Sequence, residues 1–441
     1  MRSVRLSAVD RQIFAIALPA GFALASEPLM VLADTAIVGH LGTTPLAGLA
    51  VASTVLNTVV GLCIFLAYGS TAAAARSHGA GAIREAHAIG ISAMWLAAGL
   101  GLVLSIAMLA GATTIAAHLA SSAQVADQAR TYLSIISTAL PAMLIVLAAT
   151  GALRGDLDLR TPLLVTVVAN AANILLNFVL VYGYGLGIAG SALGTTIAQW
   201  GSAVWLGGVV VVRARRSGAD TRPRPSAVLG AAREGVPLFA RTVTLRIALL
   251  LPTVLAARLG DSPLAAHQVA MAVVTFIAYA LDAIAIAGQT LTGRSLGAGD
   301  AVATRGLARR MMGWGLAAGV LAGFFLAVVS PLVTTGFATD PDVHHALRPV
   351  LLIVAAIQPV SGVVFVLDGL LIGAGDGRYL AAAGVVTLAV YAPLAVILGG
   401  WGFSWLWVAY GGFMLARLVT LALRERSERW MVLGASRTAL R

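Results

Sequence analysis

The sequence contains no lysine, a single cysteine and few charged residues of either sign. Without a lysine the chain cannot contain a P-loop, so any step driven by nucleotide hydrolysis would need a separate subunit. The one cysteine, Cys63, excludes an intramolecular disulfide and a cysteine-based metal site. Charged residues make up 11% of the chain, where a soluble domain has roughly 25%. An ordinary soluble protein is therefore excluded.

Hydrophobic residues make up 59% of the chain, and the mean hydropathy is +0.92. Apolar runs of about 20 residues, long enough to cross the ~30 Å hydrocarbon core of a bilayer, recur along the whole sequence. These runs are continuous and lack the alternation of barrel strands, so they predict helices. We expect an all-α polytopic membrane protein with twelve transmembrane helices, near residues 12–39, 46–75, 88–118, 128–152, 161–183, 189–212, 233–258, 264–292, 306–334, 345–372, 380–399 and 403–423.

Arginine supplies every basic residue, and it is unevenly divided between the connectors. It is frequent at the N-terminus and in every second connector after it, whereas the alternate connectors hold only Arg130, Arg258 and Arg348. The positive-inside rule then places both termini in the cytoplasm, and we expect a multi-pass protein of the bacterial inner membrane. This topology and anionic lipid headgroups explain the net charge of +11, so nucleic acid is not an expected partner.

The two halves of the chain match each other with one constant offset in residue number, so that position 40 corresponds to position 258. HLGTTPLAGLAV (40–51) matches RLGDSPLAAHQV (258–269), and ARSHGAG (75–81) matches GRSLGAG (293–299) with the same offset. Such a constant register indicates a duplication. We expect an N-lobe with helices 1–6, a basic cytoplasmic linker, a C-lobe with helices 7–12 and a cytoplasmic tail, at residues 1–212, 213–232, 233–423 and 424–441.

Repeats offset by an even number of spans are parallel, so a pseudo-two-fold axis along the membrane normal would relate the two lobes. This architecture predicts a central cavity and alternating access. An intramembrane enzyme would need a dyad or a metal cluster at membrane depth, and the sequence has no HExxH, GxSxG or paired-aspartate motif. The seven histidines show no convincing ligand spacing. We therefore expect neither an enzyme nor a cofactor.

Four separated stretches carry a family resemblance: LADTAIVGHLGTTPLAGLA, GALRGDLDLRTPL, NFVLVYGYGLGIAGSALGT and LAAHQVAMAV. They resemble the multidrug and toxic compound extrusion (MATE) family. VPLFARTVTL, YALDAIAIAGQTLTGRSLGAGD and VLDGLLIGAGDGR look like its DinF branch. The resemblance covers both lobes. It implies export of amphipathic, often cationic small molecules in exchange for H⁺ or Na⁺, and we expect the protein to act as a monomer.

The resemblance also implies a coupling site in the N-lobe. A carboxylate 15 residues after a helix-bending proline binds the cation in that branch, and Pro19 and Asp34 have this spacing. The implied polar partners are Tyr132, Asn173, Asn177 and Thr195. Some relatives carry a second acid at the position of Asn177, which this sequence lacks. No metal is expected beyond Na⁺ at Asp34.

Asp34 and the asparagines also have a physical interpretation. An acid within a membrane helix is costly and persists where it faces a cavity or a partner. Asp34 would then exchange a cation, or it would instead lie hydrated at the external interface. Asn170, Asn173 and Asn177 share one helical face, which suits either an ion or water network or ordinary helix–helix hydrogen bonding.

Other intramembrane polar residues are candidates for the substrate cavity or for gating. Glu27 and Arg246 would pair in one conformational state, or each would face cavity water. Asp282 is a cavity candidate, whereas Asp368 would be hydrated, ion-paired or functional, and Arg241 would snorkel or serve the cavity. Two prolines in equivalent helices would act as hinges or form simple kinks, namely Pro19 and Pro237.

We therefore predict a cation-coupled antiporter that works by alternating access, with Asp34 as the coupling carboxylate. The alternative is a flippase for lipids or lipid-linked intermediates with the same architecture. That function would be expected to show a strongly cationic cavity, whereas only Arg241, Arg246 and Arg417 lie within spans.

Overall fold

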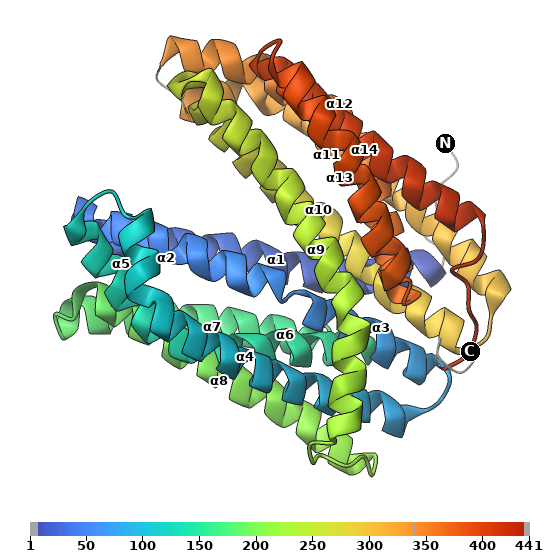
Figure 1. Ribbon diagram of the computed structural model, residues 1–441. Coiled ribbons are helices and arrows are strands. Elements are labelled where there is room, and N and C mark those ends of the chain that lie inside the picture. The colour runs from blue at the N-terminus through green and yellow to red at the C-terminus, as the bar shows by residue number, and fades with distance from the viewer. Residues whose placement is uncertain (1–7, 338–339, 436–441) are drawn as a thin grey trace. The chain divides into compact units, whose positions relative to one another are not determined.

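The computed structural model describes residues 8–337 and 340–435, and within them every regular element is a helix (Figure 1). Twelve helical segments are long and apolar enough to cross a membrane, which confirms the twelve predicted spans. The chain is a multi-pass membrane protein. In order, the helices are α1 (Ala8–Gly39), α2 (Thr43–Leu62), α3 (Phe65–Gly79), α4 (Ile83–Leu119), α5 (Ala123–Ile136), α6 (Leu140–Gly155), α7 (Arg160–Phe178), α8 (Gly187–Arg216), α9 (Pro225–Leu259), α10 (Asp261–Gly297), α11 (Ala301–Phe337), α12 (Pro341–Gly373), α13 (Gly377–Gly399) and α14 (Phe403–Arg426).

Three spans are not single α-helices. The second span is divided into α2 and α3 by a turn at residues 63–64. In the fourth span a 3₁₀ turn, η1 (Ser137–Ala139), joins α5 to α6, where Pro141 lacks the backbone N–H that a continuous helix would use. The fifth span ends in a π-helical turn, η2 (Val179–Gly183). Such interruptions are tolerated in a membrane where neighbouring groups satisfy the backbone.

The connector between the sixth and seventh spans is shorter than the basic stretch in the sequence. Helix α8 continues to Arg216 and α9 begins at Pro225, so only residues 217–224 lie between the two helices. Arginines in the last turn of α8 interact favourably with the carboxyl end of its dipole. A proline at the first helical position needs no hydrogen-bond acceptor, so it can start α9.

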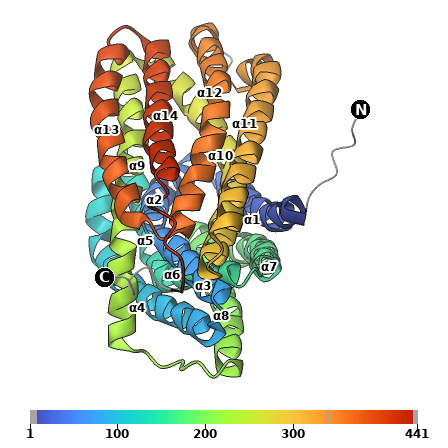
Figure 2. The ribbon, with the colours of Figure 1, turned by 90° about the vertical axis from the view of Figure 1, so that its right-hand side faces the viewer.

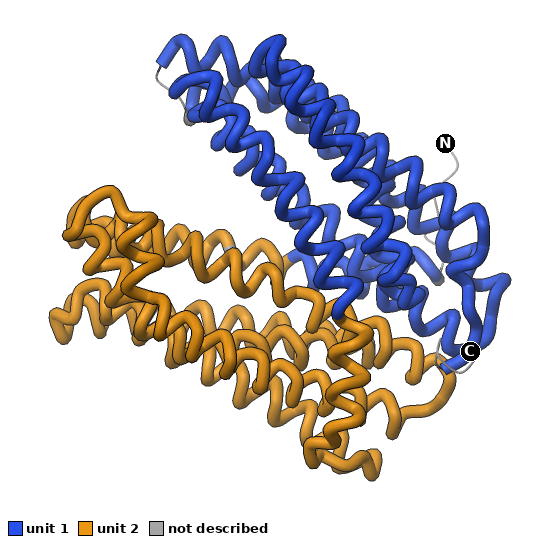
Figure 3. The backbone as a smooth tube through the Cα atoms, viewed as in Figure 1, with its two compact units in different colours: residues 1–21, 236–441 blue, residues 22–235 orange. Residues whose placement is uncertain are grey.

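The chain forms two compact units (Figure 3). Unit 2 contains residues 22–235, and α6 lies at its centre, packed against α3, α4 and α8. Helix α5 packs against α2, and α7 packs against α8. The apolar core of unit 2 includes Leu133, Leu140 and Leu153, which are fully buried.

Unit 1 contains residues 1–21 and 236–441, and α12 lies at its centre. Helices α10, α11 and α14 pack against α12, and α13 packs against α14; α11 to α14 can be followed in Figure 2. The start of α1 is attached to α11, because the buried Asp10 accepts hydrogen bonds from Arg310 Nε at 2.7 Å and Trp314 Nε1 at 2.8 Å.

Equivalent glycines allow close helix contacts in both units. A Cβ atom on Gly151 would lie 2.4 Å from the carbonyl oxygen of Ala67, and one on Gly369 would lie 2.3 Å from that of Ala285. The two glycines occupy equivalent positions of the repeat, and so do the two alanines. Each glycine begins a small-residue GxxxG pattern, which lets helix backbones approach in membranes. The duplication is therefore visible in the packing as well as in the sequence.

Candidate cation-binding site

Asp34 lies in the second half of α1 and is 7% exposed. Its side chain faces α7, where Asn177 Nδ2 donates a hydrogen bond to Asp34 Oδ1 at 2.6 Å. Asn177 is itself fully buried, and its other amide atom, Oδ1, has no hydrogen-bond partner. Asp34 is therefore largely enclosed by protein, with a buried amide as its hydrogen-bond partner.

Asn173 lies one helical turn before Asn177 and joins the same cluster. Both atoms of its amide are satisfied when Nδ2 donates to Asp34 Oδ1 at 3.1 Å and Oδ1 accepts from the hydroxyl and the backbone N–H of Thr195, at 3.0 Å and 3.2 Å. With the amide turned over, Nδ2 instead donates to Thr195 Oγ1 at 3.0 Å. The amide can thus present either a donor or an acceptor to the carboxyl group.

Tyr132 completes the set from α5. It is 3% exposed, and its hydroxyl group lies near Thr195 and Ser191 on α8 and near Asp34. The structure therefore brings together all five residues that the family resemblance implied for cation coupling, from α1, α5, α7 and α8. Ser191 was not anticipated, although it lies one helical turn before Thr195 and so on the same face.

Two further hydrogen bonds attach α1 to the fifth span on either side of the cluster, one from α7 and one from η2. Asn170 Nδ2 donates to the carbonyl oxygen of Ser26 at 3.2 Å, and the Tyr182 hydroxyl donates to that of Ile37 at 2.6 Å. Asn170 is thus a helix–helix contact. Tyr182 was not anticipated, because nothing in the sequence indicates that the π-helical turn directs its hydroxyl group towards α1. These bonds hold the second half of α1 beside α7.

Asp34 differs from the other buried acids in the kind of partner it has. Among residues 8–337 and 340–435, no arginine or histidine forms an ion pair with Asp34. Its neighbours are neutral amides and hydroxyls, which can donate to an ionised carboxylate or share a bound cation with it. A buried carboxylate without a basic partner is costly, and binding a proton or a metal cation removes that cost.

The polar cluster belongs to one half of the repeat only. The repeat counterparts of Asp34, Asn173, Asn177 and Thr195 are Pro252, Tyr391, Ala395 and Phe413. In unit 1 the rings of Tyr391 and Phe413 contact each other, with centroids 4.9 Å apart. Packing of the repeat therefore does not require polar residues at these positions.

Unit 1 instead contains a buried cluster of charges. Asp368 on α12 accepts hydrogen bonds from Arg241 on α9 and Arg417 on α14, and all three residues are buried. Arg241 Nε also lies 3.3 Å from Asp368 Oδ1. Of the alternatives for Asp368 and Arg241, the structure supports an ion pair. Arg417 is the member of the cluster that the sequence did not single out.

Arg246 and Asp282 are the remaining candidates whose side chains the structure describes. Arg246 is exposed and Asp282 is half-buried. The side chain of Glu27 lies outside what the structure describes, so its pairing with Arg246 stays a prediction. Helices α1 and α9 continue through Pro19 and Pro237, and each helix passes from one unit to the other close to its proline. The hinge role of the prolines also stays a prediction.

A family model described as MatE matches the chain twice, over residues 19–179 and 237–397. The two matches begin at Pro19 and Pro237, which are equivalent positions of the repeat. The chain belongs to the MATE family. Within it, the protein is 30% identical to DNA damage-inducible protein F of Escherichia coli, over 95% of this chain and 92% of that one. This likeness agrees with the DinF-like motifs in the sequence.

Other relatives of this MATE protein come from plants and from solved structures. It is 30% identical to Protein DETOXIFICATION 44, chloroplastic, of Arabidopsis thaliana, over 97% of this chain and 85% of that one. A crystal structure of MATE in the bent conformation has a TM-score of 0.88 at 19% identity, covering 96% of both chains. That structural likeness confirms the predicted fold class. Members of the family are multidrug-efflux transporters and not enzymes.

Proposed function

We propose that the protein is a cation-coupled antiporter that exports amphipathic, cationic small molecules by alternating access, with Asp34 as the coupling carboxylate. The observation that carries the proposal is the burial of Asp34 among Asn173, Asn177, Thr195 and Tyr132 without a basic partner. The coupling cation is H⁺ or Na⁺. Relatives named as probable multidrug resistance proteins, such as NorM of Burkholderia mallei at 30% identity, support the substrate class.

The amides provide a physical means for the site to respond to its occupant. When Asp34 is ionised, Asn177 and Asn173 donate hydrogen bonds to it. When a proton occupies the carboxyl group, it becomes a donor and needs an acceptor. Turning over the Asn173 amide presents such an acceptor while Nδ2 bonds to Thr195. A sodium ion would use the same carboxylate together with the neutral oxygens around it.

Coupling requires that substrate and cation favour different states of the transporter. A ligand shifts a conformational equilibrium only through its different affinity for the two states. In the state described here, hydrogen bonds to α7 and η2 hold the second half of α1 on both sides of Asp34. We propose that the occupancy of Asp34 changes these contacts, and that Pro19 permits α1 to bend in response. The equivalent positions in unit 1 are apolar or aromatic. We therefore expect one coupling site per chain, which binds one cation.

A flippase for lipid-linked diphosphates is the alternative function. It would need arginines that are free to bind the phosphates in the transport pathway. Arg241 and Arg417 both bind Asp368, so their charges are partly committed within unit 1. This arrangement favours the antiporter. We further propose that the protein lies in a bacterial inner membrane with both termini in the cytoplasm, and that it acts as a monomer without a cofactor.

Purified protein in proteoliposomes tests the proposal. Under an imposed pH or Na⁺ gradient, the wild type should move a fluorescent lipophilic cation, and only one of the two gradients should drive this movement. Asp34→Asn should lose the dependence on that gradient. Asp127→Asn is a matched control, because Asp127 is exposed and pairs with its neighbour Arg130 at 2.9 Å. Equal gradient-driven movement by the wild type and Asp34→Asn would remove Asp34 from the mechanism.

A further inference from the structure

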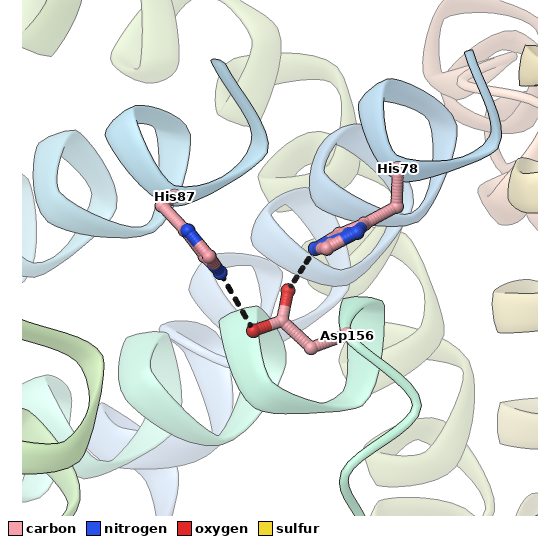
Figure 4. Close-up of side chains that lie close together, drawn as sticks. All are labelled: His78, His87 and Asp156. Carbon is pink, nitrogen blue, oxygen red and sulfur yellow. Dashed lines mark ion pairs between the residues drawn. The ribbon is translucent and has the colours of Figure 1, made fainter. Parts of the chain in front are cut away.

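A second cluster of ligand-type side chains lies at the arginine-rich end of unit 2, away from Asp34 in the sequence. His78 is in the last turn of α3, His87 near the start of α4, and Asp156 at the carboxyl end of α6. His78 Nε2 lies 2.7 Å from Asp156 Oδ1, and His87 Nε2 lies 3.3 Å from Asp156 Oδ2 (Figure 4). Three helix ends thus converge on one carboxylate.

His87 has an oxygen atom close to each ring nitrogen, Ser217 Oγ at Nδ1 and Asp156 Oδ2 at Nε2. Ser217 Oγ donates its single proton to the carbonyl oxygen of Ala214 at 2.9 Å. When it does so, it accepts from His87 Nδ1, which lies 2.9 Å away. In neutral His87 the Nε2 lone pair then points at the Asp156 carboxylate, an arrangement that is repulsive unless a cation lies between them. A bond from the second ring nitrogen to a neighbouring oxygen is also typical of metal-binding histidines.

The duplication provides an internal comparison for this cluster. The repeat counterparts of His78, His87 and Asp156 are Leu296, Arg305 and Ala374. Leu296 and Ala374 are fully buried, and Arg305 pairs with Glu428 at 2.6 Å.

The backbone at this turn is the same in both halves, because φ is 63° at Leu157 and 70° at its counterpart Gly375. The fold therefore accepts apolar residues at two of the three positions. Unit 2 carries two imidazoles and a carboxylate there, which packing alone does not require.

We infer that His78, His87 and Asp156 form a binding site for a divalent first-row transition metal ion, with Zn²⁺ as the best match. One ligand atom from each residue can be chosen so that all three lie within 4.8 Å of one another. The ligands of a tetrahedral Zn²⁺ lie roughly 3.3–3.6 Å apart, so small side-chain rotations are enough to bind the ion. Two imidazoles and one carboxylate leave the fourth position for water.

The surroundings leave the three side chains accessible to an ion, which would compete with Arg213 for Asp156. The three side chains are 16%, 13% and 9% exposed, so they are shielded but reachable. Arg213 Nη1 lies 3.4 Å from Asp156 Oδ2, while its Nη2 binds Asp158. The ion would displace the longer of these two contacts, and Arg213 would keep Asp158. Bound metal would tie the ends of α3, α4 and α6 together.

The test uses full-length protein in detergent, purified without a histidine tag, and Zn²⁺ or Co²⁺ as the probe. Calorimetry should find a Zn²⁺ site that His78→Gln and His87→Gln each weaken by at least about 100-fold, since losing only an outer-shell partner costs about 10–100-fold. Co²⁺ should give the absorption bands of a site with nitrogen and oxygen ligands. His118→Gln is the matched control, because His118 is exposed at the other end of α4 and bonds only within its own helix.

A measurement on the wild type removes any dependence on how the variants fold. Saturating Zn²⁺ should protect His78 and His87 from modification by diethylpyrocarbonate, read by mass spectrometry, and should leave His118 unprotected. Equal modification of His78 and His87 with and without Zn²⁺ would overturn the inference. Absence of Zn²⁺ binding by the wild type would overturn it too. None of these readouts depends on transport.

Discussion

The buried charges of unit 1 predict an asymmetric response to mutation. Asp368 neutralises only one of the two guanidinium groups that bind it, so the cluster has a net charge of +1. Replacing Asp368 with asparagine removes the carboxylate that both buried arginines bind. Replacing Arg417 with methionine leaves a one-to-one pair between Asp368 and Arg241 and removes the repulsion between the arginines. The loss of the acid should therefore be much the more destabilising change.

The expected magnitudes differ enough to measure. Removing one partner and leaving a buried charge uncompensated costs about 3–5 kcal/mol, so Asp368→Asn should lie at the upper end of that range or abolish folding. Arg417→Met forfeits the contact with the Phe413 ring, 5.8 Å away, which is worth about 0.5–2 kcal/mol. Its side chain is of similar length, so its total cost should stay below about 2 kcal/mol.

Unfolding in mixed detergent micelles, followed by circular dichroism, gives these free energies. Asp127→Asn serves as the control for removing an exposed acid and should change the free energy of unfolding by less than about 0.5 kcal/mol. The double variant Asp368→Asn/Arg417→Met should recover part of the stability lost in Asp368→Asn, because only one of the two buried guanidinium groups then remains. Equal costs for Asp368→Asn and Arg417→Met would refute the reasoning and show that water screens the cluster.

The packing and the charges of unit 2 give three more predictions. Gly194→Ala would place a Cβ atom 2.0 Å from Asn177 Oδ1, so gradient-driven transport should fall, whereas Gly201→Ala on the same helix meets nothing within 4 Å and should transport normally. Gly151→Ala forces backbones apart and should cost about 3 kcal/mol or more, read as a lowered unfolding temperature. Burial opposes ionisation of Asp158, but hydrogen bonds from Thr161 and Arg213 outweigh it and lower the pKa below the usual 3.8. The ionised carboxylate of Asp158 therefore stabilises the fold fully above about pH 4, and this stabilisation is lost as the pH falls through the lowered pKa. Asp158→Asn removes the group that titrates. The free energy of unfolding of the variant should therefore fall less steeply than that of the wild type in the acid limb of the stability curve. An unchanged acid limb would contradict that assignment.

The sequence was sufficient for the spans and the duplication. Hydropathy depends on residues that are adjacent in the chain, and a constant register between the two halves needs no structure to be detected. The family resemblance similarly pointed to Asp34 and its partners on α5, α7 and α8. Breaks such as η1 and η2 were not predicted, because they depend on how neighbouring helices satisfy the backbone.

The clusters of charged side chains were not predicted from the sequence, for a different reason. Asp368, Arg241 and Arg417 lie on three helices, and a single sequence does not show which distant charges face one another. The cluster of His78, His87 and Asp156 was missed because its members have no regular spacing. A signal was nevertheless present, since the second half of the repeat carries Leu296 and Ala374 at two of these positions. Comparing the halves for polar residues found in only one of them would have identified His78 and Asp156 as well as Asp34.

The role of Asp34 in coupling is tested most directly by cation movement driven by substrate. Proteoliposomes carrying a substrate gradient and no ion gradient are monitored for H⁺ with an internal pH dye and for Na⁺ with a radioactive tracer, while substrate exchange is recorded in parallel. The wild type should move one of these cations opposite to the substrate. Asp34→Asn should still exchange substrate but move no cation. Cation movement by Asp34→Asn at the wild-type rate would contradict the account.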